Sequence, residues 1–140
     1  MNIYPEEIVI PMKEELTENG FAELLSSDEV ESQLTKQGTT LVMINSVCGC
    51  SAGTARPGVL MAVANTGKKP DYLTTAFAGF DIEAVKSLRK HLLPYPPSSP
   101  SIALFKNGQL VHFIERHQIE GRPAHIIAQN LIGAFSEHCN

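Results

Sequence analysis

The sequence predicts an α/β fold in which a mixed central sheet is covered by helices on both faces. Segment 39–45 is apolar on both faces, as expected for the central strand of a covered sheet. From there, strand-like and helix-like patterns alternate in the order β-α-β-α. Farther on, the apolar segments 101–106 and 109–115 are separated by Asn107-Gly108, a dipeptide typical of a tight antiparallel hairpin.

The pattern of residues 1–20 predicts a helical extension that precedes the sheet in the chain. The pattern over 4–19 is helical but contains Pro11, a residue that suits the first turn of a helix. We therefore expect the helix to begin near Pro11, with Glu14 and Glu15 close to its positive N-terminal end.

The next two elements are a short edge strand and a helix. Segment 21–24 is short and apolar enough for the strand. Ser26 and Glu29 then have the spacing of a capping box, which predicts a helix from this point to about residue 37. The central strand follows this helix.

Beyond the central strand the pattern becomes helical from Ser51 to about Asn65, and Pro57 is expected to kink this helix. Segment 71–78 then predicts a strand, and Asp81 is expected to cap a helix that follows it.

The remaining connections are a proline-rich loop and a helix entry. Segment 93–101 contains four prolines and predicts an ordered loop before the hairpin. After the hairpin, Gly121 and Pro123 lead into a last helix.

Length and composition limit the classes of function. With 140 residues, 43% of them hydrophobic, we expect residues 1–140 to form one domain. The net charge of -4 and the absence of a basic stripe argue against nucleic acid as a partner. The sequence has neither a secretory signal pattern nor an apolar run of membrane-spanning length, so we expect a cytoplasmic protein.

The central strand leads directly to the closely spaced cysteines Cys48 and Cys50. In a reducing compartment such a pair is typical of catalysis, redox sensing or metal binding. A thiolate just before a helix faces unpaired N–H groups and the positive end of the helix dipole, which lower its pKa. We therefore assign Cys48 as the nucleophile and Cys50, which enters the first turn, as the less accessible resolving thiol.

The one-residue spacing has a geometric consequence. Two residues so placed on a regular helix point about 200° apart, so the turn must depart from helical geometry, a freedom that Gly49 supplies. Strain in the small disulfide ring is expected to make the disulfide easy to reduce.

Two other interpretations of the cysteines remain open at this point. One is a metal site, which would need Cys139 and a histidine as further ligands, because one C-x-C motif supplies too few. The other is a pair of inert buried thiols. Cys139 itself lies one residue from the end, where a frayed tail has no field to lower the pKa of its thiol.

Taken together, the dithiol at the start of a kinked helix, the proline before the hairpin and the closing helix resemble the thioredoxin fold, here with an N-terminal helical extension. Longer motifs resemble the bacilliredoxin family across nearly the whole chain. These motifs are Thr39-Thr40-Leu41-Val42, Asn45-Ser46-Val47-Cys48-Gly49-Cys50-Ser51-Ala52-Gly53, Ala55-Arg56-Pro57, Pro97-Ser98-Ser99-Pro100-Ser101, Val111-His112-Phe113-Ile114, Arg116-His117 and Ile119-Glu120-Gly121.

The resemblance implies a cytosolic thiol-disulfide oxidoreductase that removes bacillithiol from S-bacillithiolated protein cysteines. It implies bacillithiol as the thiol co-substrate, capped or disulfide-bonded proteins as the other substrates, and no tightly bound cofactor. Members of the family have also been described as disulfide isomerase-like, so a general isomerase is the alternative activity.

The resemblance also implies a substrate-binding role for the proline loop. Pro100 is expected to be a cis-proline beside the dithiol, which leaves the neighbouring backbone, including Ser99, free to hold an extended substrate. Gly121 lies where the loop before the last helix would approach the dithiol, although it is equally suited to helix entry.

Three other polar residues remain open to more than one interpretation. Arg116, His112 and His117 are suited to contact an anionic substrate, since bacillithiol carries carboxylates, but they also suit a solvent-exposed sheet edge. Arg56, next to Pro57, is expected to have a structural role.

Overall fold

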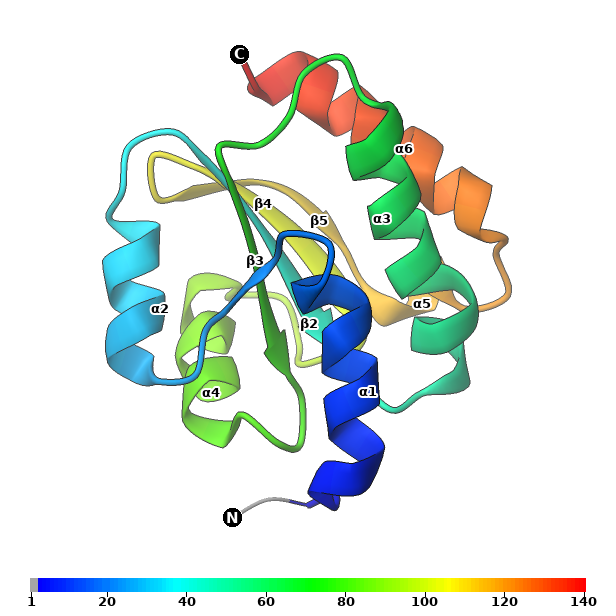
Figure 1. The fold of residues 1–140 in the computed structure, drawn as a ribbon. Helices are drawn as coiled ribbons and strands as arrows, with labels where there is room; N and C mark the ends of the chain where they lie inside the picture. Colours follow the sequence, from blue (N-terminus) through cyan, green and yellow to red (C-terminus); the bar gives the residue numbers. More distant parts are fainter. Residues whose placement is uncertain (1–2) are drawn as a thin grey trace.

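Five strands form one mixed sheet between two layers of helices in the computed structural model, which describes residues 3–140 (Figure 1). The strands are β1 (Ala22–Glu23), β2 (Thr39–Asn45), β3 (Tyr72–Phe77), β4 (Ser101–Lys106) and β5 (Gln109–Ile114). The helices are α1 (Glu6–Thr17), α2 (Ser27–Leu34), α3 (Arg56–Asn65), α4 (Ile82–His91), α5 (Arg116–Ile119) and α6 (Ala124–His138), and a π-helical turn, η1 (Ser51–Ala55), precedes α3.

The strand order is β1-β3-β2-β4-β5, which puts β2 at the centre. β2 is parallel to β3 and antiparallel to β4, and β5 completes the predicted hairpin. At the hairpin turn, Asn107 and Gly108 have positive φ values of 51° and 79°, as a tight two-residue turn requires. The predicted mixed α/β architecture is confirmed.

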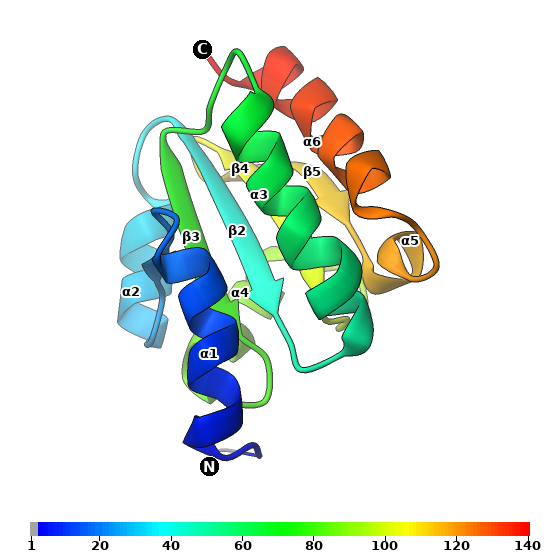
Figure 2. The same cartoon turned by 45° about the vertical axis from the view of Figure 1, so that its right-hand side comes forward.

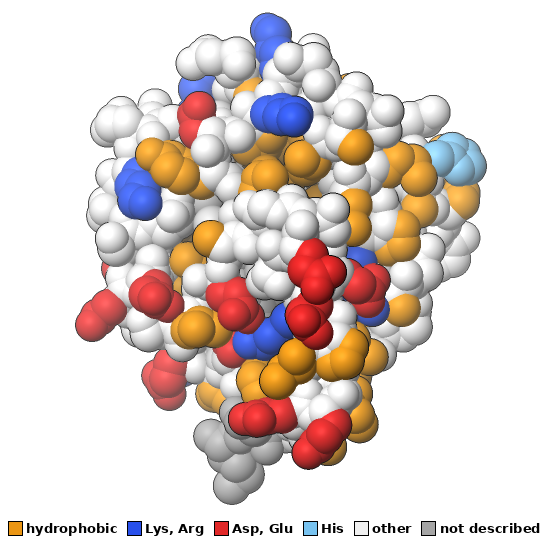
Figure 3. Space-filling view, viewed as in Figure 1, with side chains coloured by type: hydrophobic (Ala, Val, Ile, Leu, Met, Phe, Trp, Pro, Cys, Tyr) orange, Lys and Arg blue, Asp and Glu red, His pale blue; other side chains and the backbone are white. Residues whose placement is uncertain are grey.

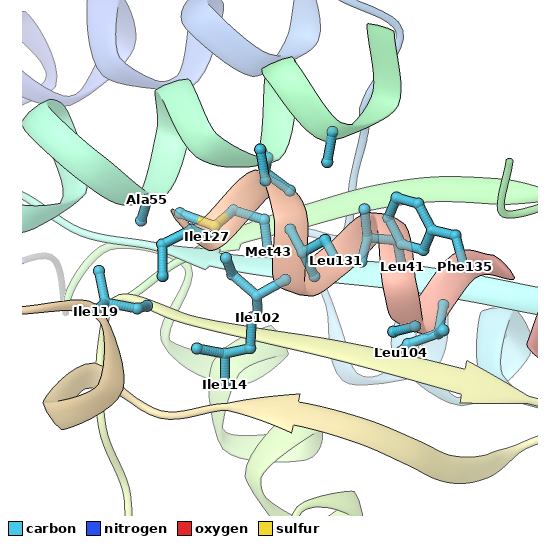
Figure 4. Packing of buried hydrophobic residues seen from close by; sticks show 14 of the residues in the cluster. Leu41, Met43, Ala55, Ile102, Leu104, Ile114, Ile119, Ile127, Leu131 and Phe135 are labelled. Atoms are coloured by element: carbon cyan, nitrogen blue, oxygen red, sulfur yellow. The ribbon is translucent and has the colours of Figure 1, made fainter. Parts of the chain in front are cut away.

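Two hydrophobic cores lie on opposite faces of the sheet. Side chains alternate along β2, so Leu41 and Met43 face one core while Val42 and Ile44 face the other. Helices α1, α3 and α6 cover the first face, and α2 and α4 cover the second (Figure 2). Figure 4 shows Met43 on the first face, close to Ile127 of α6.

The N-terminal helix differs from the sequence-based expectation. α1 begins at Glu6, directly after Pro5, and Pro11 lies inside it rather than in its first turn. Glu14 and Glu15 are therefore in its C-terminal half. The helix continues through Pro11 because tertiary packing compensates for the missing hydrogen bond, as the burial of Val9 and Leu16 indicates.

Lys13 ties this extension to the sheet. Its Nζ lies 2.9 Å from Glu23 Oε1 at the edge strand and 2.9 Å from Asp81 Oδ1 at the start of α4. It also lies 4.8 Å from the ring centre of Phe80. The ion pair with Lys13 also involves Asp81, the residue predicted to cap α4. Asp81 occupies the N-cap position of α4, but its carboxylate binds Lys13 and the N–H of Phe77 instead of the helix.

The proline loop and its surroundings contain two unforeseen features. Ser99–Pro100 is a cis peptide bond, as predicted, and Leu93–Pro94 is a second one that the sequence analysis did not predict. The short helix α5 was also not predicted. Among residues 3–140, no helix combines the length and apolar character needed to span a membrane.

Candidate active site

The dithiol lies where the central strand ends and a helix begins. Helical geometry starts at Gly49, so Cys48 stands just outside the helix. Its carbonyl accepts the first helical hydrogen bonds, from the N–H groups of Ser51 at 2.9 Å and Ala52 at 3.3 Å. Its sulfur accepts a hydrogen bond from the N–H of Cys50 at 3.4 Å. Cys50 has helical backbone angles and both thiols are free, so the departure from helical geometry expected for a Cys48–Cys50 disulfide stays a prediction.

The two thiols have opposite tendencies to ionise. Burial alone raises the pKa of Cys48, but hydrogen bonds from the thiol and N–H of Cys50 lower it, as do the charge of Arg116 and the N–H of Ser51. The balance holds the pKa of Cys48 below its ordinary value. Burial, the hydrogen bond to Cys48 and the charge of Cys48 raise the pKa of Cys50 to about 11. Cys48 is therefore the thiol that ionises first.

The surroundings of the two thiols also favour Cys48 as the attacking thiol. Both cysteines are half-buried, so the predicted difference in exposure is not what separates them. Cys50 packs against the hydrophobic core under α3 and α6. Cys48 lines an open pocket. A thiolate on Cys48 thus faces solvent and any incoming disulfide.

Arg56 connects the end of β2, the turn that carries Cys48, and α1. Its guanidinium Nη1 donates to Asn45 Oδ1 at 2.8 Å, to the carbonyl of Ser46 at 3.1 Å and to Ser51 Oγ at 3.1 Å. Its Nη2 lies 3.1 Å from Glu15 Oε2 in α1, and its side chain is only 2% exposed. The predicted structural role of Arg56 agrees with these contacts.

A π-helical turn, rather than a simple kink, precedes Pro57. The residues before it form the π-helical turn η1, in which the N–H of Arg56 donates to the carbonyl of Ser51. Pro57 lacks an N–H and its ring crowds the preceding turn, so regular α-helical bonding is interrupted here. Arg56, which follows this turn, reaches back to Ser51 at its start.

The pocket beside Cys48 has a volume of about 430 Å³. It draws on the strand end, the N-terminal segment, the loop after β3, α4, the proline loop and α5. Its lining residues are Ile3, Tyr4, Ser46, Val47, Cys48, Ala78, Gly79, Arg89, Ser99 and Arg116. The pocket thus brings together Cys48 and Ser99, two of the predicted site residues.

The other predicted site residues lie outside the lining of this pocket. Pro100 is buried directly beside Ser99. Gly121 is exposed, with a φ of 74°. His112 binds Asn130 Oδ1 at 2.6 Å, and the side chain of His117 is 72% exposed. Neither histidine lines the pocket.

Arg89 and Arg116 are pocket residues that were absent from the predicted site. Arg116 appeared in the sequence analysis only as an open alternative, and Arg89 did not appear at all. The motif Arg116-His117 was the one available signal. Nothing in the helical pattern around Arg89 distinguishes it from the neighbouring Lys90.

Cys139 does not lie on the frayed tail that was expected, and it is far from the dithiol. It is 3% exposed and belongs to the core, and burial raises the pKa of its thiol. The thiol contacts Thr39 at the start of β2, whereas Cys48 follows the end of β2, about 20 Å away along a seven-residue strand. Cys139 thus cannot complete a metal site with the dithiol. Residues 3–140 contain no cluster of three or more His, Cys, Asp or Glu side chains suited to a metal ion.

Solved structures with similar folds identify the class of protein. The chain is similar to oxidised thioredoxin from Plasmodium falciparum, with a TM-score of 0.57 and 17% identity over 82% of this chain and 97% of that one. It is also similar to mitochondrial thioredoxin 3 of Saccharomyces cerevisiae, with a TM-score of 0.58 and 14% identity over 88% and 98% of the two chains. The fold is the thioredoxin fold.

Sequence relatives identify the family and, with the fold, the activity. The family model described as disulphide isomerase matches residues 4–139. A bacilliredoxin of Cytophaga hutchinsonii is 55% identical over 96% of this chain and 99% of its own length. A bacilliredoxin of Halalkalibacterium halodurans is 52% identical over 97% and 94% of the two chains. The protein is a thiol-disulfide oxidoreductase of the thioredoxin fold. The chain belongs to the bacilliredoxin family, as its motifs predicted.

Replacing Arg56 tests its role in supporting the turn. We expect Arg56→Gln to lower the free energy of unfolding by about 2–4 kcal/mol, because the buried carbonyl of Ser46 loses its donor and Asn45 Oδ1 loses one of its three. Glu15→Gln should cost less, about 1 kcal/mol, because the amide oxygen can still accept from Arg56 Nη2 and the Glu15 side chain is 46% exposed. Urea unfolding measures both, and similar losses would contradict this account.

The ionisation of Cys48 should depend on Arg116. Its positive charge stabilises the thiolate, so Arg116→Gln should raise the pKa of Cys48 and slow its alkylation at neutral pH. Iodoacetamide labelling followed by intact mass across a pH series gives the midpoint. The matched control is His117→Gln, next in sequence but 72% exposed and not among the groups that shift Cys48. Equal midpoints in the two variants would contradict the assignment.

Proposed function

We propose that this protein removes bacillithiol from S-bacillithiolated cysteines of cytoplasmic proteins, with no tightly bound cofactor. Cys48 is the attacking thiol and Cys50 the resolving thiol. The observation that carries the assignment is the contrast between them, a pKa below the ordinary value for Cys48 and of about 11 for Cys50. The names of the related bacilliredoxins support bacillithiol as the thiol exchanged.

In the first step, the Cys48 thiolate attacks the bacillithiol sulfur of the mixed disulfide. A bond forms between Cys48 and bacillithiol while the bond to the target cysteine breaks. The target sulfur leaves with the electron pair and takes up a proton from water. The number of disulfide bonds is unchanged, so this step exchanges thiols without net oxidation.

In the second step, Cys50 loses its proton and attacks the Cys48 sulfur. Bacillithiol leaves as a thiolate, and a disulfide joins Cys48 to Cys50. The two cysteines have now given up two electrons, which have reduced the original mixed disulfide. An external thiol reductant must return these electrons before another cycle. Burial, the hydrogen bond to Cys48 and the charge of the Cys48 thiolate all raise the pKa of Cys50, and the cap removes the last of these, so Cys50 loses its proton more readily once Cys48 is capped.

The proline loop is proposed to contact the substrate. Ser99 lines the pocket, although its carbonyl already accepts a hydrogen bond from Arg116 Nη1 at 3.2 Å. Pro100 is buried and would act by shaping the adjacent backbone. Gly121 is exposed, and we assign it a contact with the part of the target protein that extends past the pocket.

General disulfide isomerisation is the second candidate activity. The description of the matching family model favours it. An isomerase requires the same attack by Cys48, but the sulfur attacked belongs to a disulfide between two protein cysteines. Comparing a scrambled disulfide protein with a bacillithiolated protein as substrates separates the two activities.

Intact-mass analysis of single-cysteine variants tests the proposed function. A bacillithiolated protein is presented to the wild type, Cys48→Ala and Cys50→Ala. We expect Cys50→Ala to release the target and to retain one bacillithiol on Cys48, because the cap has no resolving thiol. Cys48→Ala should leave the target capped.

A matched control variant completes this experiment. Cys139→Ala should behave as the wild type, because its thiol is buried near the far end of β2. Removal of the cap by Cys48→Ala would overturn the assignment of the nucleophile. Transfer to Cys48 only from disulfides between protein cysteines would favour the isomerase.

A further inference from the structure

Two arginines converge on the pocket beside Cys48 from separate elements. Arg89 extends from α4, and Arg116 begins α5, 27 positions later in the chain. Nη1 of Arg89 donates to the carbonyl of Ser98 at 3.4 Å, and Nη1 of Arg116 donates to the carbonyl of Ser99 at 3.2 Å. The proline loop thus fixes both guanidiniums at the pocket wall.

The pocket lining carries the positive charges of two arginines and no negative charge. None of its lining residues is acidic, although the chain carries a net charge of -4. Acidic side chains gather elsewhere, as around α1 on the face shown in Figure 3. Across residues 3–140, no carboxylate lies within 4.0 Å of the Arg89 guanidinium, and Arg116 has only the exposed Glu120, at 3.3 Å.

From this arrangement we infer that the pocket binds the small-molecule part of the mixed disulfide and selects caps that carry two or more carboxylates. The inference rests on the proposed function, since it places the cap on Cys48. Arg89 and Arg116 act as specificity residues that form charge-assisted hydrogen bonds with the carboxylates. Bacillithiol, which carries carboxylates, belongs to this chemical class.

The geometry of thiol exchange supports this placement. Once Cys48 has attacked the cap sulfur, the cap is bonded to Cys48 and must occupy the space next to it. The displaced target sulfur leaves from the opposite side, because the three sulfurs are in line during the exchange. The pocket volume of about 430 Å³ lies in the range of about 300–1,000 Å³ that is typical of small-molecule sites.

The N-terminal extension completes the pocket wall. The N–H of Ile3 donates to the carbonyl of Gly79 at 2.9 Å, and Tyr4 packs against the Cα of Gly79, where φ is +80° and a Cβ would clash with the ring. This close approach brings Ile3 and Tyr4 into the lining. The cap therefore lies between the arginines and a partly apolar wall.

Stabilising the Cys48 thiolate does not account for both arginines. Arg116 contributes to that effect, but Arg89 is not among the groups that shift the pKa of Cys48. Arg89 is half-buried, and burial lowers the pKa of its guanidinium, so its position at the pocket has an electrostatic cost. An anionic ligand would offset that cost.

Caps of different charge on one target protein test the inference. The same cysteine is capped either with thiomalate, which carries two carboxylates, or with neutral 2-mercaptoethanol. The rate of cap transfer to Cys48 is measured by intact mass in a Cys50→Ala background. The intrinsic reactivity of each cap is normalised against its reaction with free cysteine. We expect a normalised preference for the thiomalate cap of about tenfold.

Arginine variants in the same background identify the residues responsible. Arg89→Gln and Arg116→Gln should each lower the thiomalate preference severalfold, whereas Arg89→Lys should retain part of it because the charge remains. Arg122→Gln is the matched control, because Arg122 is exposed and does not line the pocket. It should leave the preference unchanged. Circular dichroism confirms that each variant is folded.

The possible outcomes separate this inference from the proposed function. Transfer of both caps without a preference, or a preference that both glutamine variants retain, would overturn the inference and leave Cys48 as the nucleophile. A similar loss in Arg122→Gln would also overturn it, because the effect would then reflect overall charge. Failure of both caps to reach Cys48 would overturn both the inference and the proposed function.

Discussion

The buried guanidinium of Arg56 connects the elements that make up the active site. It binds Asn45 at the end of β2, Ser46 in the turn and Ser51 in the first helical turn. Its contact with Glu15 adds the N-terminal helix. Because a buried cation is costly unless it is paired, these contacts restrict the turn to a narrow set of conformations. The position of Cys48 between the strand and the helix depends on them.

This fixed turn gives two cysteines that are separated by one residue different chemistry. Cys48 lies outside the helix, where N–H groups and Arg116 stabilise its thiolate. Cys50 lies one residue beyond Gly49, packs against the core and keeps its proton. The different environments follow from backbone placement, so the one-residue spacing does not make the thiols equivalent. Attack and resolution can thus be divided between them.

The sequence was sufficient to predict those parts of the fold that local patterns determine. The apolar segment 39–45 and the Asn107-Gly108 turn each predicted a strand arrangement that the structure contains. The dithiol could be identified because only Gly49 separates Cys48 from Cys50 in the chain. Pro57 correctly signalled an irregular helix, but the local pattern did not predict the π-helical form of η1, in which the N–H of Arg56 donates to the carbonyl of Ser51.

Features created by distant contacts were missed or wrongly interpreted. Arg89 belongs to the pocket only because α4 packs beside the proline loop, a contact that the helical pattern does not encode. Pro11 was expected in a first turn, but packing of Val9 and Leu16 lets the helix begin earlier. Cys139 was expected on a frayed tail, but it is buried in the core that α6 and β2 share. Its position near the end of the chain does not predict that packing.

The central claim is that Cys48 and Cys50 work as one redox pair whose disulfide is easily reduced. Redox titration against glutathione buffers, with the thiol state read by alkylation and intact mass, tests it most directly. The account predicts one two-electron transition at a potential more positive than that of thioredoxin, about -270 mV. A potential at or below that value, or the absence of a disulfide between Cys48 and Cys50, would contradict it.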